Sequence, residues 1–267
     1  MRFDKVLHRD LDKIKKLTPD GWSDISVEFK RYINYDFCEP IKVTENNRII
    51  GLGCSMIFKK SSWLAHIIVD RALRRRGIGT LMVNYLISAL KAKNIETILL
   101  IATELGEPIY KKVGFRVISD YLFFNRTSSW TDKEISKKIR PYDQESYSQV
   151  IELDESISGE CREPLIKNYL NDGFVYVDNR NLHGFYLPNL GEGAIYADLP
   201  EAGLELMKLK YSTVNKAVIP AQNEKGIEFL QQNGFIKTDR MARRMILGKD
   251  IDWKPECFYS RIGGNYG

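Results

Sequence analysis

The residues with the clearest chemical potential form the segment VDRALRRRGIGT, from Val69 to Thr80. Three consecutive arginines, Arg74 to Arg76, run directly into Gly77-Ile78-Gly79. Residues 63–70 before them are an apolar run of strand length, and residues 80–94 after them repeat apolar side chains at helical spacing. The segment is therefore predicted to form a turn from a strand into a helix. Because the first turn of a helix has unpaired N–H groups and a partial positive charge, this turn is suited to bind an anion.

Two other phosphate-binding loops do not fit this segment. A Walker loop needs a glycine, four residues and then Gly-Lys followed by Ser or Thr, and the sequence has no such run. A dinucleotide fingerprint needs a third glycine where Met82 stands. A solvated charge run and a nucleic-acid patch are the alternatives, but the next helix is mostly apolar and the net charge is only +5. We favour a phosphate cradle, because glycines at 77 and 79 let an anion approach the backbone.

The composition is that of a globular protein with a full core. Of the 267 residues, 43% are hydrophobic and 28% are charged, which argues against disorder. No apolar run reaches the length of a membrane span, and the first residues lack the apolar stretch of a signal peptide, so we expect a cytoplasmic protein with no membrane partner. The four cysteines and three histidines lack paired metal-ligand spacing, so we expect reduced thiols and no metal.

An internal repeat organises the chain. Each half contains a strand–turn–strand pattern, then an apolar strand, then a short amphipathic helix that ends in Gly-Phe before a β-rich tail. These three features span 41–53, 97–102 and 109–124 in the first half and 174–187, 216–221 and 229–244 in the second. We predict two copies of one α/β unit, residues 1–135 and 136–267, divided within the polar segment 127–143.

The arginine–glycine turn resembles the Arg/Gln-x-x-Gly-x-Gly/Ala motif of the GNAT N-acetyltransferase superfamily, which binds the pyrophosphate of acetyl-CoA. Residues 97–115 are similar to the strand and helix that follow this motif in the family, with Tyr110 shortly before Gly-Phe. Stretches such as 21–29 and 244–248 resemble a bacterial tandem-domain subgroup with a YitH/HolE-like C-terminal domain. The resemblance implies an α/β (α+β) fold of two tandem GNAT-like domains, each a twisted mixed sheet flanked by helices.

The same resemblance implies that acetyl-CoA is the co-substrate and that the first half binds it. The backbone of Ile68 and Val69 would hold the pantetheine, and Thr103 stands where many relatives have an asparagine that contacts the cofactor. The turn would supply the pyrophosphate site, which comprises Arg74, Arg75, Arg76, Gly77, Ile78, Gly79 and Thr80.

Acetyl transfer to an amine needs a base for the amine and an acid for the leaving thiolate. Tyr110 stands at the position of the family's general acid, and a phenol with a pKa near ~10 keeps its proton at pH 7; a core tyrosine is the alternative. His66 is a candidate base, since residues 63–69 contain no carboxylate. A packed strand histidine, a carboxylate from elsewhere and an amine that arrives neutral stay open. Trp22 either borders the acceptor pocket or is buried.

The second half departs from the motif. It has no Arg-x-x-Gly-x-Gly, places Glu201 and Glu205 where a phosphate would bind, and has Leu230 in place of the tyrosine, although Asn223 keeps the place of Thr103. We expect this half to close the acceptor pocket without binding acetyl-CoA, or else to be structural or dimerising.

The chain is thus predicted to be an N-acetyltransferase that acts on a small-molecule or peptide amine by direct attack, without nucleic acid. A non-catalytic acyl-CoA sensor or partner-binding protein is the alternative. The sequence leaves the acceptor, the acyl chain and the oligomeric state open.

Overall fold

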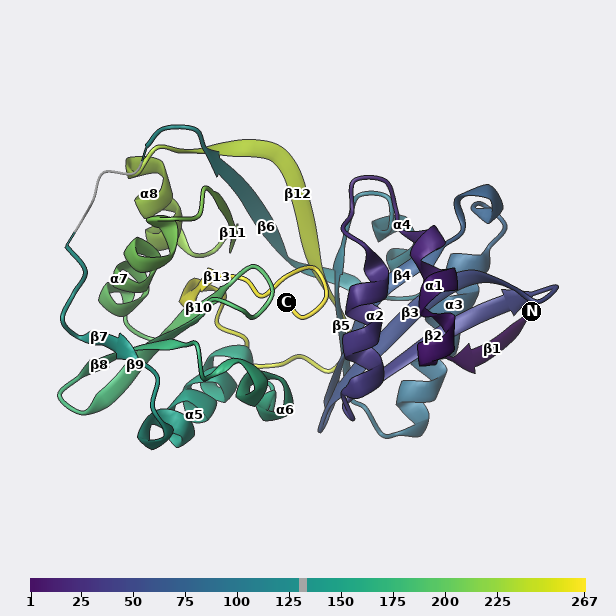
Figure 1. Ribbon diagram of the computed structural model, residues 1–267, viewed down its shortest axis with the longest axis horizontal. Helices are drawn as coiled ribbons and strands as arrows, with labels where there is room; N and C mark the ends of the chain where they lie inside the picture. Colours follow the sequence, from purple (N-terminus) through teal and green to yellow (C-terminus); the bar gives the residue numbers. More distant parts are fainter. Residues whose placement is uncertain (130–133) are drawn as a thin grey trace. The chain divides into compact units, whose positions relative to one another are not determined.

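The computed structural model describes residues 1–129 and 134–267, which form two compact units (Figure 1). Unit 1 comprises Met1–Arg116, Met245–Lys249 and Gly264–Tyr266, and unit 2 comprises Val117–Arg244, Asp250–Gly263 and Gly267. The linker expected within 127–143 includes residues 130–133, which lie outside the described residues. The division near residue 135 stays a prediction about the two halves of the sequence, because each compact unit also contains segments from the other half.

Unit 1 is built on a mixed sheet. Its strands follow the order β1-β2-β3-β4-β5 and then the end of β12, with antiparallel neighbours from β1 to β4 and a parallel β4–β5 pair. The strands are β1 (Arg2–Lys5), β2 (Cys38–Glu45), β3 (Arg48–Phe58), β4 (Ser61–Val69), β5 (Thr97–Ala102) and β12 (Phe235–Gly248). The apolar runs that predicted β4 and β5 are confirmed as strands, and both are largely buried.

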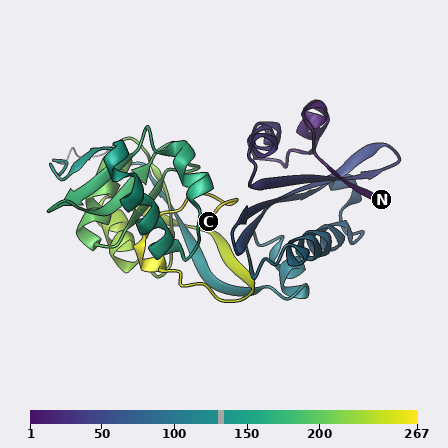
Figure 2. The same cartoon turned by 90° about the horizontal axis from the view of Figure 1, so that it is seen from below.

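Helices cover both faces of this sheet. They are α1 (Leu11–Ile14), α2 (Ile25–Asn34), α3 (Ile78–Ala92) and α4 (Glu107–Lys112). Figure 2 shows α1 and α2 on one face and α3 on the opposite face. The helical spacing after the arginines is confirmed, because α3 buries Met82, Leu86 and Leu90 against the sheet.

The second half of the sequence repeats the order of elements of the first half. The sequence strand–strand–strand–helix–strand–helix–strand runs from β2 to β6 in the first half and from β8 to β12 in the second. The second set comprises β8 (Phe174–Asp178), β9 (Asn181–Leu187), β10 (Ala194–Ala197), α7 (Pro200–Tyr211), β11 (Lys216–Pro220) and α8 (Glu224–Gln232). The other α-helices and strands in the described ranges are β6 (Arg116–Arg126), β7 (Ile139–Pro141), α5 (Tyr147–Ser158), α6 (Glu163–Ile166) and β13 (Phe258–Ser260).

Each unit takes a strand from the other half of the sequence. In unit 2, β6 pairs antiparallel with β11, from Lys216 opposite Asn125 to Pro220 opposite Tyr121. In unit 1, the end of β12 is the strand beside β5, and the Thr97 hydroxyl donates to the Lys249 carbonyl at 2.8 Å. Met245 in this strand is fully buried. The strands of the first half of the sequence therefore need the end of β12 to complete the sheet of unit 1, and β11 of the second half needs β6 as its neighbour in unit 2.

No helix in the two described ranges is both long and apolar enough to cross a bilayer. All four cysteines are free thiols, and Cys38 and Cys54 are buried. Within the same ranges, no three or more His, Cys, Asp or Glu side chains gather as they would to hold a metal ion.

Candidate functional site

Strands β4 and β5 are paired only where they begin. The parallel register runs from Ser61 opposite Thr97 to Trp63 opposite Leu99 and goes no further, although β4 continues to Val69 and β5 to Ala102. We call the unpaired portions, residues 64–69 and 100–102, the β4–β5 fork. Along the fork no strand in the described part of the chain pairs with the edge of β4 that faces β5, so an extended ligand can pair with this edge as an added strand would.

A bulge in β4 redirects the strand inside the fork. The register with β3 shifts between Leu52, which lies opposite Ile68, and Cys54, which lies opposite Ala65. His66 in this bulge has a φ of 50°, a left-handed backbone that is rare for a non-glycine residue. A bulge re-aims side chains relative to the regular alternation of a strand and is common beside active sites. Ile68 and Val69 follow it directly and return β4 to its register with β3.

The arginine–glycine turn joins the end of β4 to α3, as the sequence predicts. Gly77 is the N-cap of α3 and has a φ of 78°, which suits glycine because it lacks a Cβ. The first N–H groups of α3, including those of Ile78, Gly79 and Thr80, are the ones for which a helix offers no carbonyl partner. A methyl group built on Gly79 would lie 3.3 Å from Ile109 Cδ1 and 3.8 Å from Val69 Cγ2. The turn thus brings the end of β4, the start of α3 and α4 together.

The three arginines of the turn are exposed to solvent. Arg74 donates through Nε to the Val69 carbonyl at 3.3 Å, which folds its side chain back toward the fork. Arg76 lies 3.6 Å from Glu45, a distance at which an exposed pair contributes little. Both guanidinium groups therefore keep donors available to an anion at the start of α3, where the helix dipole adds to their positive charge.

Thr103 and Tyr110 lie at the far side of the fork, after β5. The Thr103 carbonyl accepts hydrogen bonds from the N–H groups of Gly106 and Glu107, both at 3.0 Å, so Thr103 marks the entry to α4. Tyr110 packs edge-on against Phe115 with ring centroids 5.9 Å apart. Burial raises the pKa of Tyr110 to about 12, so the phenol keeps its proton throughout the neutral range.

His66 is held by a hydrogen bond from α2. The Tyr32 hydroxyl and His66 Nδ1 are 2.8 Å apart, and the Tyr32 side chain is fully buried. The other ring nitrogen, Nε2, makes no hydrogen bond to any residue in the described part of the chain. Burial lowers the pKa of His66 to about 4, so the imidazole is neutral at pH 7. One of its two nitrogens therefore carries the proton and the other an electron pair that can accept a hydrogen bond.

Trp22 lies against the same histidine. The two rings meet edge to face with centroids 5.7 Å apart, and 47% of Trp22 is exposed. Phe29 of α2 packs on another side of His66, with centroids 6.1 Å apart. The exposure of Trp22 argues against the alternative of a buried core tryptophan, because the indole borders solvent next to His66.

Sequence reasoning missed two residues beside His66. Tyr32 lies in α2, and Asn265 lies in the C-terminal tail, residues 253–267. The Asn265 amide donates through Nδ2 to the Tyr32 hydroxyl at 3.0 Å. No local signal could have joined them, because the two residues are 233 positions apart in the sequence.

The counterpart of the fork in unit 2 is filled by the chain itself. Strand β13 pairs with β10, with Ser260 opposite Ile195 and Phe258 opposite Tyr196. On the other side, the Arg261 N–H donates to the Val218 carbonyl of β11 at 3.3 Å. The tail therefore occupies the space between β10 and β11, which are the counterparts of β4 and β5 by their order in the chain.

Side chains lock the tail in this position. Asn223, the counterpart of Thr103, donates through Nδ2 to the Phe258 carbonyl at 3.0 Å, and buried Lys210 donates to the Ser260 hydroxyl at 2.6 Å. The Tyr259 ring covers Gly203 of α7 so closely that a Cβ there would lie 2.2 Å from it. Glu201 lies at the start of α7, where unit 1 has its arginines and glycines.

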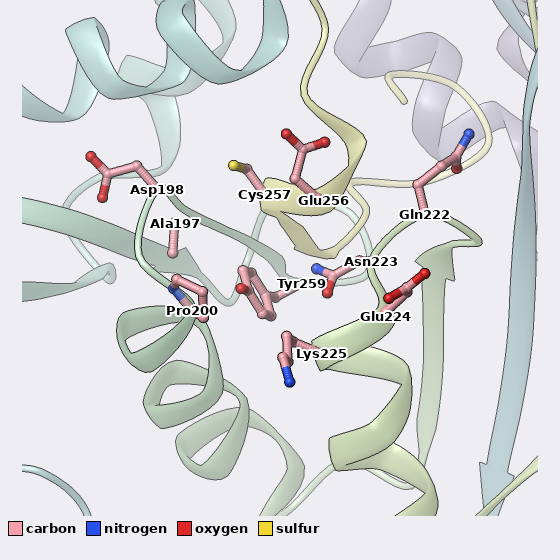
Figure 3. Close-up of a pocket in the computed structure, with 10 residues that line it drawn as sticks. All are labelled: Ala197, Asp198, Pro200, Gln222, Asn223, Glu224, Lys225, Glu256, Cys257 and Tyr259. Atoms are coloured by element: carbon pink, nitrogen blue, oxygen red, sulfur yellow. The ribbon is translucent and has the colours of Figure 1, made fainter.

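A pocket of about 210 Å³ remains beside this tail. Figure 3 shows Tyr259 between the first turns of α7 and α8, with Asn223 next to it. The lining carries three carboxylates and one lysine, namely Asp198, Glu224, Glu256 and Lys225. This excess of negative charge disfavours a phosphate-bearing ligand.

Comparisons with known proteins agree with this architecture. Residues 22–135 match the family model described as an acetyltransferase (GNAT) domain. A search of curated proteins found no match to the chain. The fold is that of solved GNAT acetyltransferase structures, with twisted mixed sheets flanked by helices.

Two of these structures cover nearly the whole chain. A candidate acetyltransferase from Pyrococcus horikoshii is 20% identical, with a TM-score of 0.83 over 100% of this chain and 95% of its own. A GCN5-related N-acetyltransferase from Sphaerobacter thermophilus is 13% identical, with a TM-score of 0.65 over 95% of this chain and 98% of its own. At these identities the similarity shows the fold alone.

Proposed function

We propose that unit 1 binds acetyl-CoA and transfers its acetyl group to a primary amine by direct attack. The observation that carries this proposal is the arginine–glycine turn at the end of β4, where the start of a 15-residue helix meets the open fork. A ligand with a diphosphate at one end and an extended amide chain at the other matches both features at once. The GNAT domain match over residues 22–135 supports the same substrate.

The binding roles follow from the chemistry of each segment. The diphosphate would accept hydrogen bonds from the first N–H groups of α3 and from the guanidinium groups of the turn, with Gly77 and Gly79 permitting close approach. The pantetheine amides would pair with the backbone of Ile68 and Val69, and the Thr103 hydroxyl would add one hydrogen bond from the β5 side. Acetyl-CoA supplies an activated thioester carbonyl to this site.

Tyr110 is proposed as the general acid. Its phenol stays protonated at neutral pH because burial raises its pKa to about 12. A thiolate that leaves into a poorly solvated site also has a raised proton affinity, since burial disfavours the charged form of both groups. Proton donation from Tyr110 to the thiolate sulfur would therefore accompany cleavage of the C–S bond.

His66 is proposed as the base that takes the amine proton. Its imidazole is neutral because burial lowers its pKa to about 4. An amine nitrogen becomes more acidic as it bonds to the carbonyl carbon, so a neutral imidazole in hydrogen-bonding reach can take its proton as the bond forms. Trp22, exposed beside His66, is proposed as a wall for the amine acceptor.

Unit 2 is proposed to bind no acetyl-CoA. Strand β13 occupies the space between β10 and β11, Glu201 lies at the start of α7, and Leu230 stands where unit 1 has Tyr110. Each feature removes one part of the binding or catalytic apparatus. The proposed stoichiometry is one acetyl-CoA per chain.

A screen of amine libraries tests the activity. The purified full-length chain is incubated with acetyl-CoA and pooled small amines, amino acids and peptides, and mass spectrometry follows acetylated products and free CoA. The proposal predicts equal amounts of both for at least one amine, and loss of both in Tyr110→Phe. Acetyl-CoA binding without transfer to any amine would instead favour an acyl-CoA sensor.

A further inference from the structure

The C-terminal segment Gly264–Tyr266 belongs to unit 1, although the residues just before it belong to unit 2. Backbone hydrogen bonds close the tail into a turn around it, from Gly267 N–H to the Gly263 carbonyl at 3.3 Å and from Ile262 N–H to the Gly267 carbonyl at 2.8 Å. Tyr266 is buried and meets Tyr32 edge to face, with centroids 6.4 Å apart. The segment is therefore an ordered part of the surroundings of His66.

Three side chains form a continuous hydrogen-bonded chain at this point. Asn265 Nδ2 donates to the Tyr32 hydroxyl oxygen at 3.0 Å, and the same hydroxyl lies 2.8 Å from His66 Nδ1. Because Tyr32 is fully buried, its own O–H proton needs an acceptor, and His66 Nδ1 is the acceptor in place. When Tyr32 donates to Nδ1, the single proton of the neutral imidazole lies on Nε2.

We propose that Asn265 is a positioning residue that sets the tautomer of His66 through Tyr32. As a donor to Tyr32, the Asn265 amide places the imidazole proton on Nε2. Rotation of the amide by half a turn would present its carbonyl instead, so that Tyr32 donates to Asn265 and accepts from Nδ1–H. Nε2 would then have its electron pair free. An amide can support both states because it has a donor and an acceptor at its two ends.

This inference rests on the proposed function, because the tautomer of His66 matters only if His66 is the base. The tautomer itself can be tested whether or not His66 is the base. If His66 takes a proton from the amine at Nε2, the three hydrogen-bonded side chains must first adopt the second state. Asn265 permits this reversal of the hydrogen-bond directions without a change of charge. The tail would thus complete the site in unit 1 by controlling whether His66 presents a donor or an acceptor. The tautomer itself can be observed in the protein without any acceptor.

The experiment is nitrogen NMR of the three histidines in the ¹⁵N-labelled full chain, which reports the protonation of each ring nitrogen directly. His66→Gln assigns the His66 signals by their disappearance. In the wild-type chain at neutral pH we expect a neutral His66 with its proton on Nε2. A wild-type His66 with its proton mainly on Nδ1 would overturn the proposal without any variant.

Asn265→Asp gives the directional test. A carboxylate only accepts, so Tyr32 must donate to it and must accept from Nδ1–H. The ratio of the two tautomers should shift toward Nδ1–H by about tenfold or more, because the new hydrogen bond is assisted by charge. The matched control is Asn171→Asp, at an exposed turn residue of unit 2, which should leave the His66 signals unchanged.

Tyr32→Phe separates positioning from a general structural effect. In this background Asn265→Asp should no longer move the His66 proton, because the hydroxyl that links the two residues is gone. A shift of equal size with and without the Tyr32 hydroxyl would overturn the proposed route, as would unchanged His66 signals in a folded Asn265→Asp protein. Acetyl-CoA affinity, measured by calorimetry, should stay within about twofold in the Asn265→Asp, Asn171→Asp and Tyr32→Phe proteins, since none of these changes alters the arginine–glycine turn or the fork. Absence of acetyl-CoA binding in the wild-type chain would defeat the proposed function and leave the tautomer result standing.

Discussion

Gly79 offers the sharpest test of the proposed cofactor site. The residue lies one position inside α3, and its missing side chain leaves room for Val69 of β4 and Ile109 of α4. A Cβ would lie 3.3 Å from Ile109 Cδ1, which is tight but tolerable for a small shift of a side-chain end. Gly79→Leu places further carbons in the same space, at the start of α3 where the diphosphate is proposed to bind. The substitution should therefore block a diphosphate while leaving the helix in place.

The expected loss follows from the hydrogen bonds at stake. A hydrogen bond to a charged group contributes about 1.5–3 kcal/mol, so each one lost weakens binding by roughly 10- to 10²-fold. Displacement of the diphosphate from this helix start removes at least one such bond and shifts others, so we expect acetyl-CoA affinity to fall about 10²-fold or more. Overpacking against Ile109 costs about 1–3 kcal/mol of stability, which lowers the melting temperature without unfolding the protein.

Calorimetric titration with acetyl-CoA measures the affinity, and thermal melting monitored by circular dichroism checks the fold. Gly79→Ala is the matched control, because its single methyl group should cost less than about tenfold in affinity. A folded Gly79→Leu protein that binds acetyl-CoA as tightly as the wild-type chain would show that the turn is not the diphosphate site.

Three further predictions concern the acid, the buried lysine and the exchanged strand. Tyr110→Phe should lower kcat by about 10²- to 10⁴-fold with little change in acetyl-CoA affinity, and undiminished turnover would remove the general acid from the mechanism. Burial lowers the pKa of Lys210 from 10.5 to about 7, so the unfolded chain binds a proton that the folded chain lacks between these values. The free energy of unfolding should therefore rise with pH above about 7, and urea titrations should find a smaller rise in Lys210→Met. Met245→Ala should lower the unfolding free energy by about 2–5 kcal/mol, since this fully buried residue joins β12 to the core of unit 1; a cost below about 1 kcal/mol would argue against the strand exchange.

The local elements could be predicted from the sequence because they depend on neighbouring residues, whereas the anion site stays a prediction. Apolar runs predicted β4 and β5, and helical spacing predicted α3, since burial on one face imposes those periods. The arginines and glycines between β4 and α3 predicted a helix-terminus anion site by their types and order alone. His66 and Trp22 were selected as candidates from sequence, and the structure places their rings in contact.

The strands that pair with β6 and β12, and the contacts of the C-terminal tail, could not be predicted from local sequence patterns. β6 and β12 are both recognisable in the sequence as β-rich segments. The pattern of a single strand does not say which sheet edge it joins, so the pairing of β6 with β11 and the place of β12 beside β5 could not be predicted. β13 has three residues, too few to show a period. The link between Asn265 and Tyr32 depends on the packing of the whole of unit 1.

We propose that the chain has one working acetyl-CoA site, in unit 1, because its own tail fills the corresponding space in unit 2. Native mass spectrometry of the full-length chain with increasing acetyl-CoA counts bound molecules directly. We expect saturation at one acetyl-CoA per chain, and almost no acetyl-CoA bound to Gly79→Leu at the concentrations that half-saturate the wild-type chain. A second equivalent, or one that persists in Gly79→Leu, would contradict it.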